Sequence, residues 1–124
     1  IGVAAAAVEE MQAKFLSNPA DIIAAIGPSV CAKHYEVGQE VVEQVQQAFG
    51  ADATRVLSNN NDGMLPGKAN FDLWMANRLI LERSGVGQIE NANICTACHP
   101  EDWYSHRAEE GRTGRFGVLV GLKN

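Results

Sequence analysis

Apolar residues recur three and four positions apart in three stretches of this chain, with short apolar runs between and after them. This spacing places apolar side chains on one face of a helix. It predicts one helix over Ile1 to Leu16, a second beginning after Gly38 and a third over Phe71 to Ser84. Their inward residues are Ala4, Val8, Met11 and Phe15; Val41, Val45 and Phe49; and Leu73, Asn77 and Ile80. Each helix must bury its apolar face against another layer.

Turn-forming residues mark the ends of these helices. Asn18-Pro19 ends the first predicted helix, while Asn70 is expected to cap the start of the third and Gly85 to stop it. The stretch from Ser58 to Lys68 is rich in Asn, Asp, Gly and Pro and is predicted to be a long polar loop. Loops of this length are often functional.

Three apolar runs are predicted to be strands. Ile22 to Ile26 resembles a buried strand that ends at Gly27-Pro28, and further strands are expected around Gln88 to Cys95 and over Phe116 to Leu122. The resulting order predicts an α+β fold, an α/β sandwich with a mixed sheet and flanking helices. Because the chain opens on a helix and has few strands, it is either a complete domain or part of a larger sheet whose other strands lie upstream.

Length, charge and cysteine content limit the kinds of protein that this chain can be. A chain of 124 residues with 46% hydrophobic content fits one globular domain. Its net charge of −5 disfavours nucleic acid as a partner, and no apolar stretch is long enough to cross a membrane. Three cysteines and no visible secretory signal favour a reducing, cytoplasmic setting.

The run Cys95 to His99 has the spacing Cys-x-x-Cys-His of c-type haem attachment. A second axial ligand would then come from Met11, Met64, Met75, His34 or His106. The two cysteines also form half of a zinc site, for which only Cys31 remains as a further cysteine. The other interpretations are that Cys95 and Cys98 form a redox pair, or that they merely end a buried strand.

Basic and aromatic side chains are concentrated between Trp103 and Arg115. This stretch holds three arginines, a histidine and two large aromatic residues in an acidic chain. Guanidinium groups bind phosphate or carboxylate through two parallel hydrogen bonds, and an aromatic ring can stack on a base. The alternative is a solvated loop in which the arginines pair with Glu101, Asp102, Glu109 and Glu110. His34 is similarly either an acid or base at a strand end or a structural histidine.

Four segments in order resemble the laccase-domain family, whose members are named both multicopper polyphenol oxidases and purine nucleoside phosphorylases. They are Ile26-Gly27-Pro28 with Tyr35 to Gly38, Phe71 to Asn77, Cys95-Thr96, and Ser105-His106-Arg107 leading to Thr113-Gly114-Arg115. Members often have Cys-Cys at Lys33-His34 and Ser-Tyr-Arg-Arg at Ser105 to Ala108. Arg107 and Arg115 stand on matching positions.

The resemblance implies a fold similar to the catalytic domain of the cytotoxic necrotising factors. It identifies residues 1–124 as the C-terminal part of a single laccase-like domain, an incomplete domain whose N-terminal half lies upstream. It also implies one zinc or copper ion, held by two histidines and a cysteine in motifs resembling Q-V-H-G, A-D-C and H-A-G-W-R-G. None of these motifs occurs here. No metal ligand is therefore expected in this chain, which alone should bind no stoichiometric zinc or copper.

The function that the resemblance implies is metal-dependent chemistry on purine nucleosides. The expected reactions are phosphorolysis of adenosine or inosine and deamination of adenosine, with the nucleoside and phosphate as partners. The residues expected to bind substrate or phosphate are Arg107, Arg115, His106, Tyr104 and Asn77, with both arginines at one anion-binding locus. Alternatives are copper-dependent oxidation of phenolic substrates, a non-catalytic fragment, and a c-type haem protein.

Overall fold

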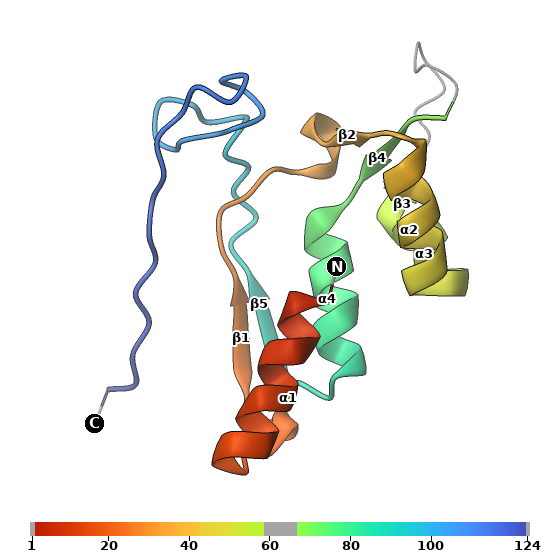
Figure 1. Ribbon diagram of the computed structural model, residues 1–124. Helices are drawn as coiled ribbons and strands as arrows, with labels where there is room; N and C mark the ends of the chain where they lie inside the picture. Colours follow the sequence, from red (N-terminus) through yellow and green to blue (C-terminus); the bar gives the residue numbers. More distant parts are fainter. Residues whose placement is uncertain (1, 59–66, 124) are drawn as a thin grey trace.

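A computed structural model describes residues 2–58 and 67–123 of the chain (Figure 1). It is a mixed α+β structure with flanking helices, as the sequence predicts. In chain order the elements are α1 (Val3–Phe15), η1 (Pro19–Asp21), β1 (Ile23–Ile26), η2 (Ala32–His34), β2 (Glu36–Val37), α2 (Gln39–Phe49), η3 (Gly50–Asp52), α3 (Ala53–Val56), β3 (Leu57–Ser58), β4 (Ala69–Phe71), α4 (Leu73–Arg83) and β5 (Gln88–Asn91). Of the helices described, none has the length and apolar character that crossing a membrane requires.

A two-stranded parallel sheet joins β1 to β5, with Ile23 opposite Gln88 and Ile26 opposite Asn91. Helices α1 and α4 lie beside this sheet (Figure 1). Val8 and Leu81 pack against its inner side chains in a small core. On the outer side Ile23 is 68% exposed, so the strand predicted to be buried is covered on one face only.

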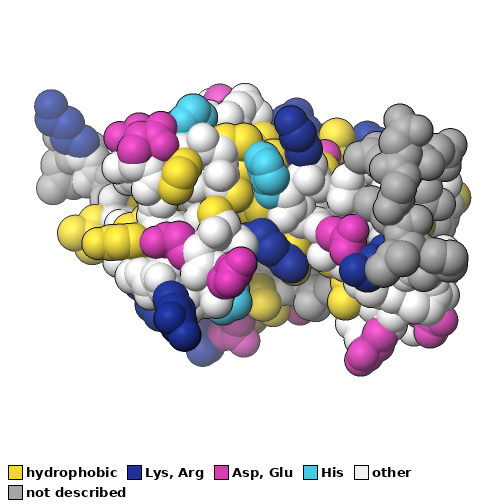
Figure 2. Space-filling model, turned by 90° about the horizontal axis from the view of Figure 1, so that it is seen from above, with side chains coloured by type: hydrophobic (Ala, Val, Ile, Leu, Met, Phe, Trp, Pro, Cys, Tyr) yellow, Lys and Arg dark blue, Asp and Glu magenta, His cyan; other side chains and the backbone are white. Residues whose placement is uncertain are grey.

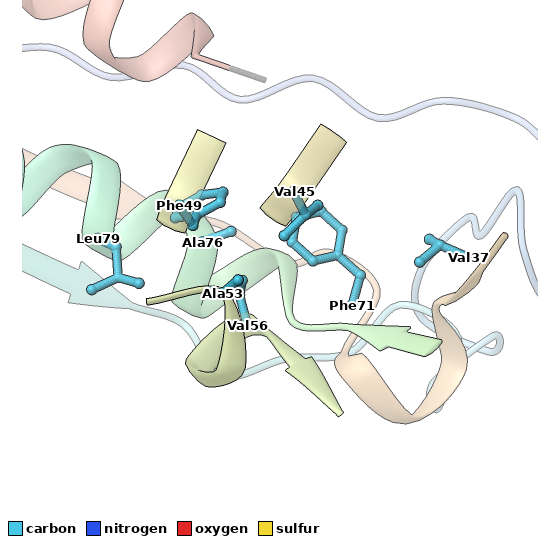
Figure 3. Close-up of a cluster of buried hydrophobic side chains, with 8 residues drawn as sticks. All are labelled: Val37, Val45, Phe49, Ala53, Val56, Phe71, Ala76 and Leu79. Carbon is cyan, nitrogen blue, oxygen red and sulfur yellow. The ribbon is translucent and has the colours of Figure 1, made fainter. Parts of the chain in front are cut away.

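The larger core lies between α2, α3, α4 and an antiparallel sheet of order β2-β4-β3. Figure 3 shows Val45 and Phe49 of α2 close to Phe71 of β4 and to Ala76 and Leu79 of α4. The sequence predicted α2 correctly, and its residues Val45 and Phe49 are buried as expected. Helix α4 contributes to both cores, since Leu81 on the same helix packs in the smaller one.

Asp72 and Gly85 fix the two ends of α4. The carboxylate of Asp72 accepts a hydrogen bond from the Met75 amide at 2.9 Å and caps the first turn. At the other end Gly85 adopts φ 81° and its amide donates to the Glu82 carbonyl at 3.0 Å. The predicted stop at Gly85 is confirmed. The predicted cap at Asn70 is wrong, because Asn70 is buried within β4.

Two parts of the chain leave apolar side chains uncovered. Helix α1 forms as predicted, but of its expected inward face only Val8 is buried, and Phe15 is 75% exposed. The strand predicted over 116–122 is wrong, since residues 92–123 form no helix or strand. Phe116 packs edge-on against Trp103, with 5.1 Å between ring centroids, and beyond it Leu119 is fully exposed.

The strand predicted over 116–122 does not form because this segment has no neighbouring strand or covering layer among the described residues. A strand needs a partner strand and a covering layer, and in Figure 1 the segment after Phe116 runs alone beside the rest of the fold. Most of the loop predicted over 58–68 lies outside the described residues.

Candidate functional site

Four side chains able to bind a metal converge where the loops after β1 and β5 meet. Cys31 precedes η2 and His34 is its last residue, while Cys95 and Cys98 follow β5. The parallel pairing of β1 and β5 sends both loops out at the same end of the sheet, and Ser29 continues it by bridging to Cys95. We call these four residues the Cys/His cluster.

The imidazole of His34 lies close to all three sulfurs of the cluster. Its Nδ1 is 3.5 Å from the sulfur of Cys31, 3.7 Å from that of Cys95 and 3.4 Å from that of Cys98. All four donor atoms lie within 4.8 Å of one another. The backbone amide of Cys31 donates to the sulfur of Cys95 at 3.3 Å. Three sulfurs and a nitrogen from two distant segments therefore surround one point.

The two cysteines of the Cys-x-x-Cys pair differ in acidity. Burial of the Cys95 thiol raises its pKa, but hydrogen bonds from the Cys31 backbone and from His34 outweigh burial and lower the pKa to about 6. The hydrogen bond to Cys95 and burial raise the pKa of Cys98 to about 11. Cys95 is thus the thiolate of the pair at neutral pH, stabilised by donors around it.

His99 lies outside the cluster, although it completes the Cys-x-x-Cys-His run. Its Nδ1 is 3.5 Å from the carboxylate of Glu101, and its side chain is exposed. Both sulfurs of the pair approach His34 instead, and Cys95 is buried. A haem attached to both cysteines with His99 as its axial ligand does not suit this arrangement.

A pocket of about 410 Å³ opens beside the cluster and is lined by Pro28, Ser29, Val30, Tyr35, Leu73, Thr96, Tyr104, Ser105, His106, Arg107 and Phe116. Its wall combines the two loops that carry the cluster with the segment rich in arginine. Figure 2 looks down on this end of the molecule and shows histidine and basic side chains lying among hydrophobic ones. The pocket is of the size and mixed character of small-molecule sites.

Arg107 lies over the ring of Tyr35, with its Cζ 5.0 Å from the ring centroid. Within residues 2–58 and 67–123 it forms no ion pair, and the same is true of Arg115. Glu109 is instead occupied by hydrogen bonds from the Ser105 amide at 2.8 Å and from the hydroxyl of Thr113. Among the described residues, these arginines therefore do not pair with the neighbouring acidic side chains.

Arg115 lines a second pocket of about 320 Å³, which shares Tyr104, His106 and Phe116 with the first. The two arginines therefore border adjoining pockets, with Tyr104 and His106 between them, rather than lining one. Next to Arg115, a Cβ on Gly114 would lie 2.8 Å from Cζ of Tyr104. The backbone at Gly114 thus lies directly against the tyrosine ring.

Asn77 lies apart from the other expected binding residues. It is partly buried on α4, where its side-chain amide donates to the Leu73 carbonyl at 2.9 Å. It lines a different pocket, together with Val41, Phe49 and Ile80. Its role in binding substrate stays a prediction.

The profile of the family described as "Multi-copper polyphenol oxidoreductase laccase" matches residues 1–123. The chain belongs to this laccase family. The purine nucleoside phosphorylase YlmD of Bacillus subtilis is 38% identical over 94% of this chain, and a purine nucleoside phosphorylase of Bacteroides thetaiotaomicron is 36% identical over 89%. The crystal structure of the hypothetical protein YfiH of Bacillus licheniformis covers 91% of the chain at a TM-score of 0.82 and 31% identity.

The chain spans only part of these laccase-family relatives. It covers 41% of the length of each of the two phosphorylases and 42% of the YfiH structure. The family that the resemblance indicated is therefore confirmed, and the match is confined to less than half of each relative.

The sequence predicted no metal ligand in this chain, whereas the structure brings together four side chains that could hold a metal ion. The sequence analysis did not foresee that His34 joins the three cysteines. Counting cysteines left Cys31 alone, so half a zinc site seemed to lack its partner. The signal was present, because Cys31-x-x-His34 repeats the spacing of Cys95-x-x-Cys98. What the sequence did not reveal is that the two pairs meet.

Proposed function

We propose that this chain provides the phosphate- and nucleoside-binding part of a metal-dependent purine nucleoside phosphorylase. The relatives that carry this name support the proposal. The single observation that carries it is the position of Arg107, a guanidinium with no ion pair among the described residues, at the wall of a pocket of about 410 Å³.

Arg107 is suited to hold the attacking phosphate. A guanidinium presents two parallel N–H groups that match two phosphate oxygens, and its binding does not depend on pH in the physiological range. The ring of Tyr35 lies against this guanidinium, with 5.0 Å between Cζ of Arg107 and the ring centroid, and Arg107 is otherwise exposed to solvent. Arg115 in the adjoining pocket adds a second positive charge.

Phosphorolysis then requires the nucleoside to be placed beside the phosphate. A phosphate oxygen forms a bond to C1′ of the ribose while the C1′–N bond to the purine breaks, giving ribose 1-phosphate and the base, which takes up a proton. The exposed ring of Tyr104 is suited to stack on the purine, and His106 lines both pockets and is placed to hydrogen-bond it. Holding the phosphate and the nucleoside in the correct relative position contributes much of the rate acceleration.

The Cys/His cluster does not fit the catalytic metal of such an enzyme. Catalytic zinc sites use three protein ligands and keep one position open for water, whereas this cluster offers four donors around one point. We therefore propose that the ligands of the catalytic metal lie outside this chain. When bound, it would supply a metal-activated water for the deamination of adenosine.

We further propose that the rest of a laccase-like domain covers the exposed apolar side chains of this chain. Phe15 on α1 and Leu119 in the C-terminal segment are the clearest examples. Full activity then belongs to the whole domain, with a fold similar to the catalytic domain of the cytotoxic necrotising factors. Three free cysteines also suit a reducing, cytoplasmic location.

The test is an assay of the full-length protein with inosine or adenosine, with and without phosphate. We expect release of hypoxanthine or adenine only when phosphate is present. Arg107→Lys keeps the charge but loses the two-pronged geometry, so it should lower activity, while the matched change Arg112→Lys on the same loop, which lines neither pocket, should not. Base release without phosphate, or full activity in Arg107→Lys, would contradict the proposal.

A further inference from the structure

We propose that the Cys/His cluster binds one zinc ion, and that this ion fastens the C-terminal loop to the rest of the fold. The site is separate from the ligand motifs expected for the catalytic metal, none of which occurs in this chain. Its ligands are the sulfurs of Cys31, Cys95 and Cys98 and Nδ1 of His34.

The nitrogen-to-sulfur distances within the cluster match those of a zinc tetrahedron. With zinc–sulfur bonds of about 2.3 Å and zinc–nitrogen bonds of about 2.0 Å, tetrahedral geometry separates a sulfur from a nitrogen donor by about 3.5 Å. The distances from Nδ1 of His34 to the three sulfurs are 3.4, 3.5 and 3.7 Å. An ordinary structural histidine needs one hydrogen-bond partner, and nothing in its hydrogen bonding requires three sulfurs at nearly equal distance.

The local backbone also suits metal binding. Each pair of ligands is separated by two residues, one pair around η2 and the other in a turn where the Cys98 amide donates to the Cys95 carbonyl at 3.2 Å. Short loops with this spacing carry the ligands of structural zinc sites. The Cys31 amide, which donates to the Cys95 sulfur at 3.3 Å, stabilises a thiolate and orients it.

The donor set favours a thiolate-binding metal such as zinc. Three thiolates and an imidazole exclude magnesium and calcium, which prefer oxygen ligands. Four protein donors complete a tetrahedron and leave no open position, which is the character of a structural zinc site. On binding, the thiols lose their protons to solvent and His34 binds as neutral imidazole.

The loop that the ion would fasten has little else to hold it. Between residues 92 and 123 there is no helix or strand, and only Cys95, Thr96 and Ser105 are buried. The bond from zinc to His34 would also fix the adjacent Tyr35, whose ring supports Arg107. The ion would thus hold one wall of the pocket in place without taking part in the reaction.

The first test is the metal content of the protein after expression with added zinc and extensive dialysis. Cys98→Ser is the most informative variant, because Cys98 is exposed and its loss removes a ligand without opening the core. We expect it, and His34→Ala, to contain one zinc per chain less than the wild type. His99→Ala is the matched control: it alters the same Cys-x-x-Cys-His run at a side chain outside the cluster and should keep its zinc.

The second test is spectroscopic. Reduced, metal-free wild type and Cys98→Ser are titrated with Co²⁺, and the wild type should show thiolate-to-cobalt absorption and visible bands of a tetrahedral site that the variant lacks and that zinc abolishes. Equal zinc in the wild type and Cys98→Ser, cobalt spectra without a thiolate band, or a zinc-free protein with a Cys95–Cys98 disulfide by mass spectrometry would each overturn the proposal. Zinc binding does not depend on the reaction proposed above, so the two ideas fail separately.

Discussion

The guanidinium of Arg107 lies over the ring of Tyr35, with its Cζ 5.0 Å from the ring centroid, and Tyr35 directly follows His34 in the chain. This contact joins the arginine-rich loop to the segment that carries half of the Cys/His cluster. The position of Arg107, the proposed phosphate-binding residue, thus depends on Tyr35, which is far from it in sequence.

Replacing Tyr35 should weaken phosphate binding. A cation over an aromatic ring at an exposed site is stabilised by about 0.5–1 kcal/mol, so Tyr35→Leu should raise KM for phosphate about two- to fivefold in the full-length enzyme. Tyr35→Phe keeps the ring and should behave as the wild type. Equal KM values in all three proteins would mean that the ring does not position Arg107.

Gly114→Ala should disturb substrate binding while stability stays unchanged. An added Cβ would lie 2.8 Å from Cζ of Tyr104, so the ring between the two pockets must move. We expect a higher KM for the nucleoside, with an unfolding midpoint within the scatter of surface substitutions. Gly117→Ala is the control, because nothing lies within 4 Å of its added Cβ. A kinetic effect of equal size in the control would refute this explanation.

Gly87→Ala should destabilise the protein. A Cβ at this position would lie 1.9 Å from the carbonyl oxygen of Ala20, so the turn before β5 must separate from η1. Overpacking of this kind typically costs about 1–3 kcal/mol. Urea unfolding of this variant beside Gly27→Ala, where the added Cβ meets nothing within 4 Å, measures the effect. No difference between the two variants would show that the turn adjusts freely.

The turn formed by residues 105–113 should loosen in acid. Hydrogen bonds from Thr113 and from the Ser105 amide lower the pKa of Glu109 below its ordinary value. A lowered folded-state pKa means that the stabilisation is present above the unfolded pKa of about 4.3 and is lost as the pH falls through the folded value. Amide exchange of Ser105 should therefore lose protection at low pH, and Glu109→Gln should remove this pH dependence. The same pH profile in the variant would assign the change to another group.

Leu119→Ala should have almost no effect on the stability of the 124-residue chain, because Leu119 is fully exposed. We expect a change in the free energy of unfolding below about 0.5 kcal/mol. Phe49→Ala, in the larger core, should cost about 3–5 kcal/mol under the same conditions. In the full-length protein a cost of about 2–5 kcal/mol at Leu119 would show that the rest of the domain covers this segment. A large loss of unfolding free energy in the 124-residue chain itself would mean that Leu119 is buried, which contradicts the structure.

Sequence alone predicted the elements whose signal is local. The period of Val41, Val45 and Phe49 predicted α2, and Gly85 marked the end of α4, because both depend on residues within a few turns of the chain. Strands β2, β3 and β4 were missed because two or three residues carry no period. The run from Phe116 to Leu122 shows the opposite error, a strand that was predicted but does not form. Apolar composition indicates which side chains favour burial, but not whether another part of the fold lies close enough to cover them.

The candidate site was only partly predictable for a related reason. Tyr104, His106 and Arg107 could be proposed together because they are adjacent in the chain. The meeting of His34 with Cys95 joins positions 61 residues apart and depends on the parallel pairing of β1 with β5. No periodicity in the sequence encodes that pairing.

Helix α4 contributes Ala76 and Leu79 to the larger core and Leu81 to the smaller one. Neither core can lose this helix without losing part of its own packing. The two halves of the fold are therefore expected to melt together, in a single cooperative transition, although they are built on separate sheets. A substitution that damages either sheet is then expected to destabilise the whole fold.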